Sequence, residues 1–223
     1  MINKNNRLTP NKEDYLKCIY EISIVSRKIT NKEIAARMQV SPPAVTEMIK
    51  RMKSENLILK DKECGYQLTD LGLKLVSELY RKHRLIEVFL VHHLNYTSDQ
   101  IHKEAEVLEH SVSDFFVERL DSMLGFPKTC PHGGTIPAKG ELLVEINNLP
   151  LAAIKETGSY LLTRVHDSFE LLHYLDKHSI QIGDTLQIKQ FDGFTNTFTL
   201  VCKGEDLQVS LDIANQLYVE KID

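Results

Sequence analysis

Hydrophobic residues recur at helical spacing in three segments near the start of the chain. The first segment is opened by Pro10, which suits a first helical turn, and its apolar positions are Tyr15, Leu16, Ile19, Tyr20 and Ile22. The second starts at the capping box Thr30 to Glu33, and the third, residues 43–56, follows the N-cap residue Ser41. Short apolar runs at residues 57–60 and 66–68 flank a polar turn and predict a hairpin. This order predicts a winged helix-turn-helix.

The third segment and the hairpin expose basic and small polar residues. A winged helix-turn-helix inserts its second paired helix into the major groove, with the N-terminal residues of that helix at the base edges. The expected DNA contacts are therefore Ser41, Pro42, Pro43, Thr46, Lys50, Arg51, Lys60 and Lys62. A three-helix interaction module that binds no nucleic acid is the alternative.

Two further helices are predicted at residues 70–93 and 101–124. The second has a strongly apolar stripe, formed by Val112, Phe115, Phe116, Val117 and Leu120. Two helices cannot cover this stripe by themselves, so we expect a homodimer interface. A two-fold dimer also pairs two winged helices as a palindromic DNA site requires.

The pattern changes to alternating strands after about residue 160. Strands are predicted at 160–165, 186–191, 197–202, 207–211 and 218–222, with a short helix at 168–177 and a turn at Asp192-Gly193. These elements predict a small SH3-like β-barrel. The expected fold class is mainly α with β, in three domains: a winged helix-turn-helix at 1–72, a helical dimerisation and metal-binding domain at 73–147, and the SH3-like barrel at 148–223.

The charge of the chain is divided unevenly. The net charge is −4, but residues 1–84 hold 17 Lys and Arg against 10 Asp and Glu, which leaves an excess of seven positive charges at that end. This excess favours a polyanionic partner for the N-terminal region. The four cysteines are widely spaced, which fits a reducing cytoplasm and argues against disulfides. With no long apolar run, we expect a cytoplasmic protein with no membrane partner.

Histidine and carboxylate side chains recur at one-turn spacing on both later helices. His83 and Glu87 form an i, i+4 pair, and Glu106 and His110 form another, with Glu109 between them and His102 one turn earlier. Two helices that carry such pairs favour a divalent metal site, whereas a solvated polar face is the alternative.

Three other positions carry candidate chemistry. Cys130-Pro131-His132 places a thiol and an imidazole in a tight, glycine-rich loop. Asp14, near the start of the first helix, is by itself typical of a residue that interacts with the helix dipole. Asp167 lies between a strand and a short helix, where it is a candidate N-cap residue.

These motifs together resemble the iron- and manganese-dependent repressors of the diphtheria-toxin-repressor family, and most closely its three-domain manganese-responsive members. The resemblance rests on four features in order: SPPAVTEMIKRM at 41–52, RKHRLIE at 81–87, EVLEH at 106–110 and the C-terminal barrel. It covers nearly the whole chain. It implies a homodimer that, when loaded with metal, binds palindromic operator DNA and represses genes, with metal-uptake genes as the expected targets.

The resemblance also implies two metal sites. Asp14, His83, Glu106, Glu109 and His110 match the ligands of a first site, and Glu87, Cys130, His132 and Asp167 match a second. His102 falls where iron-type members place an ancillary ligand, and the resemblance does not assign it to one of the two sites. Asp14 and Glu106 stand where iron-type members have Met and Cys. Lys17 stands where two-domain manganese regulators carry a ligand Glu, which argues against their close-paired binuclear arrangement.

Carboxylate and imidazole ligands without sulfur suit Mn(II), the expected metal, and Fe(II), the second candidate. We expect Zn(II) or Cd(II) to occupy the sites in vitro. Two other functions compete with this one. A metalloenzyme is disfavoured because the chain has no His-Glu-x-x-His motif and no nucleophile–base pair. A winged-helix regulator that senses an organic ligand, or oxidation of Cys130, would bind its operator equally well with and without a chelator.

Overall fold

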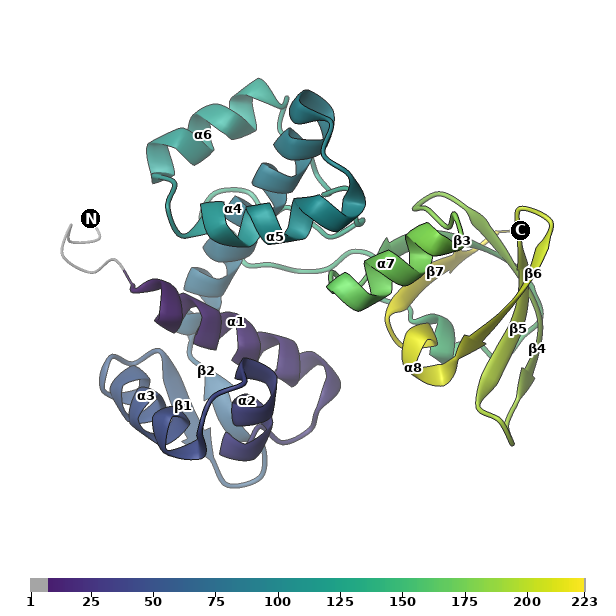
Figure 1. Ribbon diagram of the computed structural model, residues 1–223. Coiled ribbons are helices and arrows are strands. Elements are labelled where there is room, and N and C mark those ends of the chain that lie inside the picture. Colours follow the sequence, from purple (N-terminus) through teal and green to yellow (C-terminus); the bar gives the residue numbers. More distant parts are fainter. Residues whose placement is uncertain (1–7, 223) are drawn as a thin grey trace. The chain divides into compact units, whose positions relative to one another are not determined.

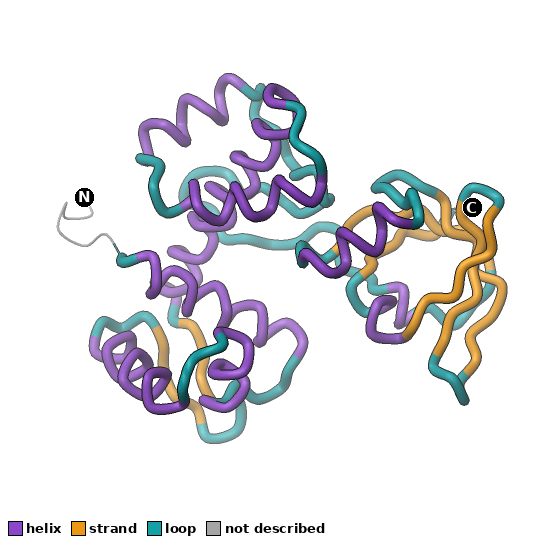
Figure 2. Tube along the Cα trace, viewed as in Figure 1, coloured by secondary structure: helices purple, strands orange, loops and turns teal. Residues whose placement is uncertain are grey.

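The computed structural model describes residues 8–222, which form two compact units (Figures 1 and 2). The first unit consists of the described residues within Met1–Lys82 together with Pro137–Leu143, and the second of those within His83–Ile136 and Val144–Asp223. The predicted fold class, mainly α with β, is confirmed. The division into three domains at residues 72 and 147 stays a prediction. Among the described residues, no helix is long and apolar enough to cross a membrane.

The first unit contains the predicted winged helix-turn-helix. Its helices are α1 (Pro10–Val25), α2 (Asn31–Met38) and α3 (Pro42–Ser54), and its wing is the antiparallel pair β1 (Ile58–Asp61) and β2 (Gly65–Leu68). Local signals explain the helix starts. The Thr30 hydroxyl and the Glu33 carboxylate form the predicted capping box, and the Ser41 hydroxyl accepts from the Ala44 N–H at 3.4 Å.

The wing is held by its turn and by one glycine. Asp61 Oδ1 accepts from the N–H groups of Glu63 and Cys64 at 2.7 and 2.8 Å, which closes the turn. Gly65 has a φ of 76° and packs so closely on Ile29 that a Cβ would lie 2.0 Å from the Ile29 carbonyl oxygen. The wing is therefore attached to the start of the helix-turn-helix rather than projecting freely.

The helix α4 (Asp70–Leu94) starts in the first unit and continues into the second. The predicted single helix at 101–124 is wrong, because the segment forms α5 (Ser98–Glu109) and α6 (Asp114–Met123). The break has a local cause. The Ser113 hydroxyl accepts from the Phe116 N–H at 3.2 Å, so Ser113 caps a new helix instead of continuing the old one.

The C-terminal part of the second unit is the predicted small barrel. Its strands are β3 (Gly158–Val165), β4 (Thr185–Asp192), β5 (Thr197–Cys202), β6 (Glu205–Ser210) and β7 (Leu217–Lys221), in the antiparallel order β6-β5-β4-β3-β7. The helix α7 (Phe169–Lys177), the four-residue α8 (Leu211–Ala214) and a single turn at Leu151–Ala153 complete it. Side chains of α7 and of alternating strand positions share one apolar core. Its largest fully buried members are Phe198, Leu151, Leu162, Leu186 and Leu200.

Candidate metal centre and nucleic-acid interface

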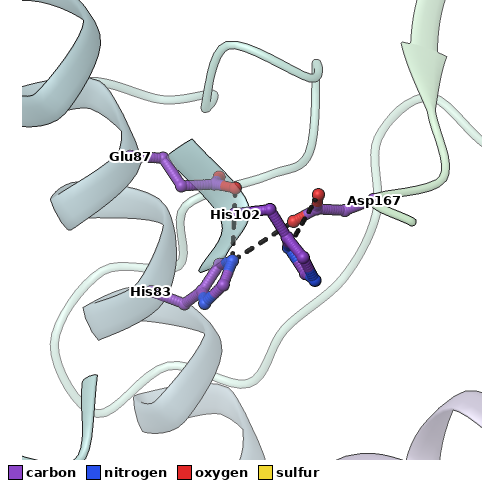
Figure 3. Close-up of side chains that lie close together, drawn as sticks. All are labelled: His83, Glu87, His102 and Asp167. Carbon is purple, nitrogen blue, oxygen red and sulfur yellow. Dashed lines mark hydrogen bonds and ion pairs between the residues drawn. The ribbon is translucent and has the colours of Figure 1, made fainter. Parts of the chain in front are cut away.

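A group of buried and partly buried imidazoles and carboxylates lies in the second unit, where α4, α5 and the segment that joins β3 to α7 meet (Figure 3). His83 and Glu87 lie one turn apart on α4, so both side chains face α5. His83 Nε2 lies 3.2 Å from Glu87 Oε1 and 3.2 Å from Asp167 Oδ2. On α5, His102 places Nδ1 3.0 Å from Asp167 Oδ1. Residues 84 positions apart in the sequence thus meet at one point.

The Cys130-Pro131-His132 loop also contacts this group. Its turn is closed by hydrogen bonds from the N–H of Gly133 to the Cys130 carbonyl and from the N–H of Cys130 to the Gly134 carbonyl, both 2.9 Å. His132 Nδ1 lies 3.2 Å from Glu87 Oε1 and 3.5 Å from Asp167 Oδ1. The four residues of the predicted second site therefore lie together.

The loop is seated directly on the barrel. The Val165 N–H donates to the His132 carbonyl at 3.0 Å. Gly133, with a φ of 77°, passes so close to β3 that a Cβ there would lie 2.1 Å from the Thr163 carbonyl oxygen. Only glycine fits this position, so the backbone as well as the side chains places His132 beside Asp167.

Four of the five residues predicted for the first site belong to the second unit. His83 Nδ1 contacts Glu109 Oε2 at 2.6 Å, and His110 Nε2 lies 3.5 Å from Glu109 Oε1. Glu106 Oε1 lies 3.3 Å from His102 Nε2. His83 thus contacts members of both predicted sites, and His102 lies beside residues of both. Asp14 lies on α1 in the first unit, so its membership of the first site stays a prediction.

The structure excludes one of the two interpretations of Asp167. The N-cap of α7 is Ser168, not Asp167. The Asp167 carboxylate instead faces His83 and His102. The N-cap interpretation is therefore wrong, and the carboxylate is available to a metal site.

Within the group, protonated histidines compensate the negative charge of the carboxylates. Burial disfavours the charged form of Asp167, but hydrogen bonds with His102 and His83 hold its pKa well below its usual value. Burial would lower the pKa of His102, yet Asp167 and Glu106 raise it to about 9. Burial would likewise lower the pKa of His132, which Glu87 and Cys130 raise to about 12. Without a metal, the protonated His102 and His132 supply the positive charge beside the carboxylates. A histidine binds a metal only in its neutral form, so metal binding must release these protons.

Burial and Glu87 raise the pKa of the Cys130 thiol, so it too must lose its proton to become a ligand.

Several potential ligand atoms of this group are buried and have no well-directed hydrogen bond to any described residue, although some of them lie 3.0 to 3.5 Å from an oppositely charged neighbour. They are both Glu87 oxygens, both His132 nitrogens, His102 Nδ1 and Asp167 Oδ1. Most native buried polar atoms are hydrogen-bonded, so such a concentration calls for a missing partner. One ligand atom from each residue lies within 4.8 Å of the others in two overlapping sets, His83–Glu87–His102–Asp167 and Glu87–Cys130–His132. The residues therefore fit a divalent cation.

The predicted DNA-contacting residues gather in the first unit. Ser41, Pro42, Pro43, Thr46, Lys50 and Arg51 lie at the start of α3 or along it, and all are exposed. Lys60 on β1 and Lys62 in the wing turn are exposed as well. The arrangement is that of a recognition helix flanked by a basic wing.

Sequence reasoning missed an arginine–glutamate network beside the metal centre. Arg84, the neighbour of His83, donates to Glu145 Oε1 at 2.6 Å and to the Thr135 carbonyl. Arg164 on β3 lies 4.0 Å from the same Glu145 oxygen. No role was predicted for Glu145, and no local spacing pairs it with Arg84 and Arg164, which lie 61 and 19 positions away. The network joins α4 to the barrel without a metal.

Three protein families match successive segments of the chain. Residues 7–65 match the iron dependent repressor, N-terminal DNA binding domain family, and residues 69–138 match the iron dependent repressor, metal binding and dimerisation domain family. Residues 149–221 match the FeoA domain family.

Among solved structures, ScaR with bound Zn2+ is 63% identical, with a TM-score of 0.92, over 96% of this chain and 100% of that one. The manganese regulator SloR is 57% identical, with a TM-score of 0.88, over the same shares. The diphtheria toxin repressor of Corynebacterium diphtheriae is 27% identical over 94% of this chain and 96% of that protein. The chain therefore belongs to the diphtheria-toxin-repressor family of metal-dependent transcriptional repressors.

Proposed function

We propose that this chain is an Mn(II)- or Fe(II)-dependent repressor that binds palindromic operator DNA as a homodimer and controls metal-uptake genes. The observation that carries the proposal is the cluster of His83, Glu87, His102 and Asp167, whose ligand atoms lie within 4.8 Å of one another. In this cluster both Glu87 oxygens, His102 Nδ1 and Asp167 Oδ1 are buried without a well-directed hydrogen bond to a described residue. The names of the relatives favour manganese, since ScaR is described as a manganese-activated repressor and SloR as a manganese regulator. ScaR has also been solved with Zn2+ and with Cd2+.

We assign the ligands to two sites as the family resemblance implies. Asp14, His83, Glu106, Glu109 and His110 would hold the first ion, and Glu87, Cys130, His132 and Asp167 the second. His102 contacts both Asp167 and Glu106, which supports it as a ligand that either site can use. The first set has only oxygen and nitrogen donors and suits Mn(II), whereas the Cys130 thiolate makes the second more favourable to Zn(II).

The proposed mechanism couples metal binding to the orientation of the DNA-binding unit. A bound divalent ion supplies the positive charge that lets several buried carboxylates stay close together. Asp14 belongs to the first unit and the other first-site ligands to the second, so their joint use ties α1 to the helical region. In a dimer, this would set the two recognition helices one DNA turn apart or a multiple of it, about 34 Å. By linkage, operator DNA would in turn tighten metal binding.

The dimer is proposed to form through the helical region. Phe115, Phe116, Met123 and Phe126 are large apolar residues that stay exposed on α6 and just beyond it. Their concentration supports an interface with a second copy. Val117 and Leu120, by contrast, are buried within the second unit and serve its own core. We propose no catalytic role, because the family consists of transcriptional repressors.

The proposal is tested with a duplex that the Mn(II)-loaded protein selects from a randomised DNA pool. Its affinity is measured by fluorescence anisotropy with Mn(II), Fe(II) or Zn(II), and with excess chelator. We expect tight binding only in the presence of a metal. Equal affinity in metal and in chelator would instead support a regulator that senses an organic ligand or oxidation.

We expect operator affinity to fall steeply with salt, because Lys and Arg contacts to phosphates release counterions. Each contact contributes about −0.9 to the log–log slope, so Arg51→Ala should make the slope of a dimer shallower by about 1.8. Lys189→Ala removes one charge from the barrel and should leave the slope unchanged. An unchanged slope in Arg51→Ala would remove Arg51 from the DNA contacts.

Asp167→Ala is expected to bind one metal ion per chain, compared with two in the unchanged protein, because Asp167 is a proposed ligand of the second site. The Arg84–Glu145–Arg164 network remains, so the barrel should stay folded, which thermal unfolding will check. Asp176→Ala, at an exposed position on α7, is the matched control and should keep two ions. Calorimetry that finds two ions in Asp167→Ala would exclude this carboxylate from the site.

A further inference from the structure

The hydroxyl of Thr46, an exposed residue on the recognition helix, is already engaged within the protein. It donates to the Pro42 carbonyl, one turn earlier on α3, at 3.0 Å. It also accepts from Asn31 Nδ2, at the start of α2, at 2.9 Å. Because the single hydroxyl proton goes to the Pro42 carbonyl, the Asn31 group that faces the hydroxyl must be the donating NH2, as it is here.

These two contacts hold one rotamer of the threonine. Rotation about the Cα–Cβ bond moves the hydroxyl and the methyl together, so fixing one group fixes the other. If the hydroxyl turned toward DNA, it would lose both hydrogen bonds. The Asn31 amide would then lose a partner as well, and its Oδ1 is already buried without a hydrogen-bond partner among the described residues. The methyl is the part of Thr46 that remains for an external contact.

We propose that Thr46 reads a thymine in the operator through its γ-methyl group, and that Asn31 is the positioning residue that holds this methyl toward the DNA. The inference rests on the proposed DNA binding by α3 and adds a specificity determinant to it. Thymine is the base whose major-groove edge carries a methyl group, and a threonine methyl is one of its usual apolar partners.

The test is uracil interference, because uracil differs from thymine only by the missing methyl. The probe is the duplex selected from a randomised pool, with scattered thymines replaced by uracil. In the unchanged, Mn(II)-loaded protein, one thymine per half-site should be sensitive, with a loss of affinity of about fourfold, as for one buried methylene. Thr46→Ser keeps the hydroxyl and lacks the methyl, so it should no longer distinguish thymine from uracil there. Thr46→Val keeps the methyl and should still distinguish them.

Asn31 is tested by the same thymine-to-uracil ratio, which does not depend on overall affinity or on the amount of folded protein. Asn31→Ala should bring the ratio close to one, and Asn31→Gln, which still offers an amide N–H to the hydroxyl, should restore it. The inference is overturned if no thymine is sensitive, if Thr46→Ser retains every sensitive position, or if Thr46→Val loses discrimination. Failure of the proposed function looks different, since the unchanged protein would then select no metal-dependent duplex at all.

Discussion

Replacing His110 or Glu106 with alanine is expected to lower operator affinity in Mn(II) by about 100-fold, to the level seen with chelator. A metal that moves a two-state equilibrium from mostly inactive to mostly active must bind the active state at least that much better. Loss of one first-site ligand removes this preference. Both side chains are partly exposed, so neither change leaves a cavity in the core. Fluorescence anisotropy with the selected duplex measures the effect.

The control for both variants is whether they remain folded and dimeric. Both variants should remain folded dimers by light scattering and thermal unfolding, because the apolar residues of the proposed interface lie on α6, apart from the polar face of α5. Glu104→Ala removes a carboxylate from α5, about 200° around the helix from Glu106, and should retain full metal stimulation. If His110→Ala is monomeric or unfolded, the residue is structural and its assignment as a ligand fails.

Gly133→Ala is expected to lower the free energy of unfolding by at least about 2 kcal/mol and to abolish the second metal site. A left-handed φ of 77° strains any residue with a Cβ, and here the Cβ would also lie 2.1 Å from the Thr163 carbonyl oxygen. The loop must move off β3 to relieve this clash, and His132 moves with it. Denaturant unfolding and metal stoichiometry by calorimetry measure the two effects.

Gly125→Ala separates backbone strain from the clash. Gly125 has a nearly equal φ of 75°, but a Cβ there would meet nothing within 4 Å. It should lose only about 1 kcal/mol and keep both metal ions. Equal losses in the two variants would show that close packing of the loop on the barrel contributes nothing.

The sequence alone determined the elements whose causes are local. The capping box at Thr30, the N-cap at Ser41 and the polar turn of the wing act over three or four residues, so the winged helix-turn-helix was predictable. The barrel strands followed from alternation and turn residues in the same way. The local rule also explains why the single helix predicted at 101–124 is wrong, because Ser113 is an N-cap residue that lies within a continuous apolar stripe.

The chemical types in the metal centre were also present in the sequence, since His and Glu at one-turn spacing on two helices suggest a shared cation. Which of these residues contact one another could not be derived from local patterns in the sequence. Only packing brings Asp167 against His83 and His102, and only packing places Glu145 between Arg84 and Arg164. Such contacts join positions 19 to 84 residues apart, and no periodicity or capping rule reaches that far. Local preferences therefore specified the helices and strands, while the burial of apolar surface between them decided which polar groups meet.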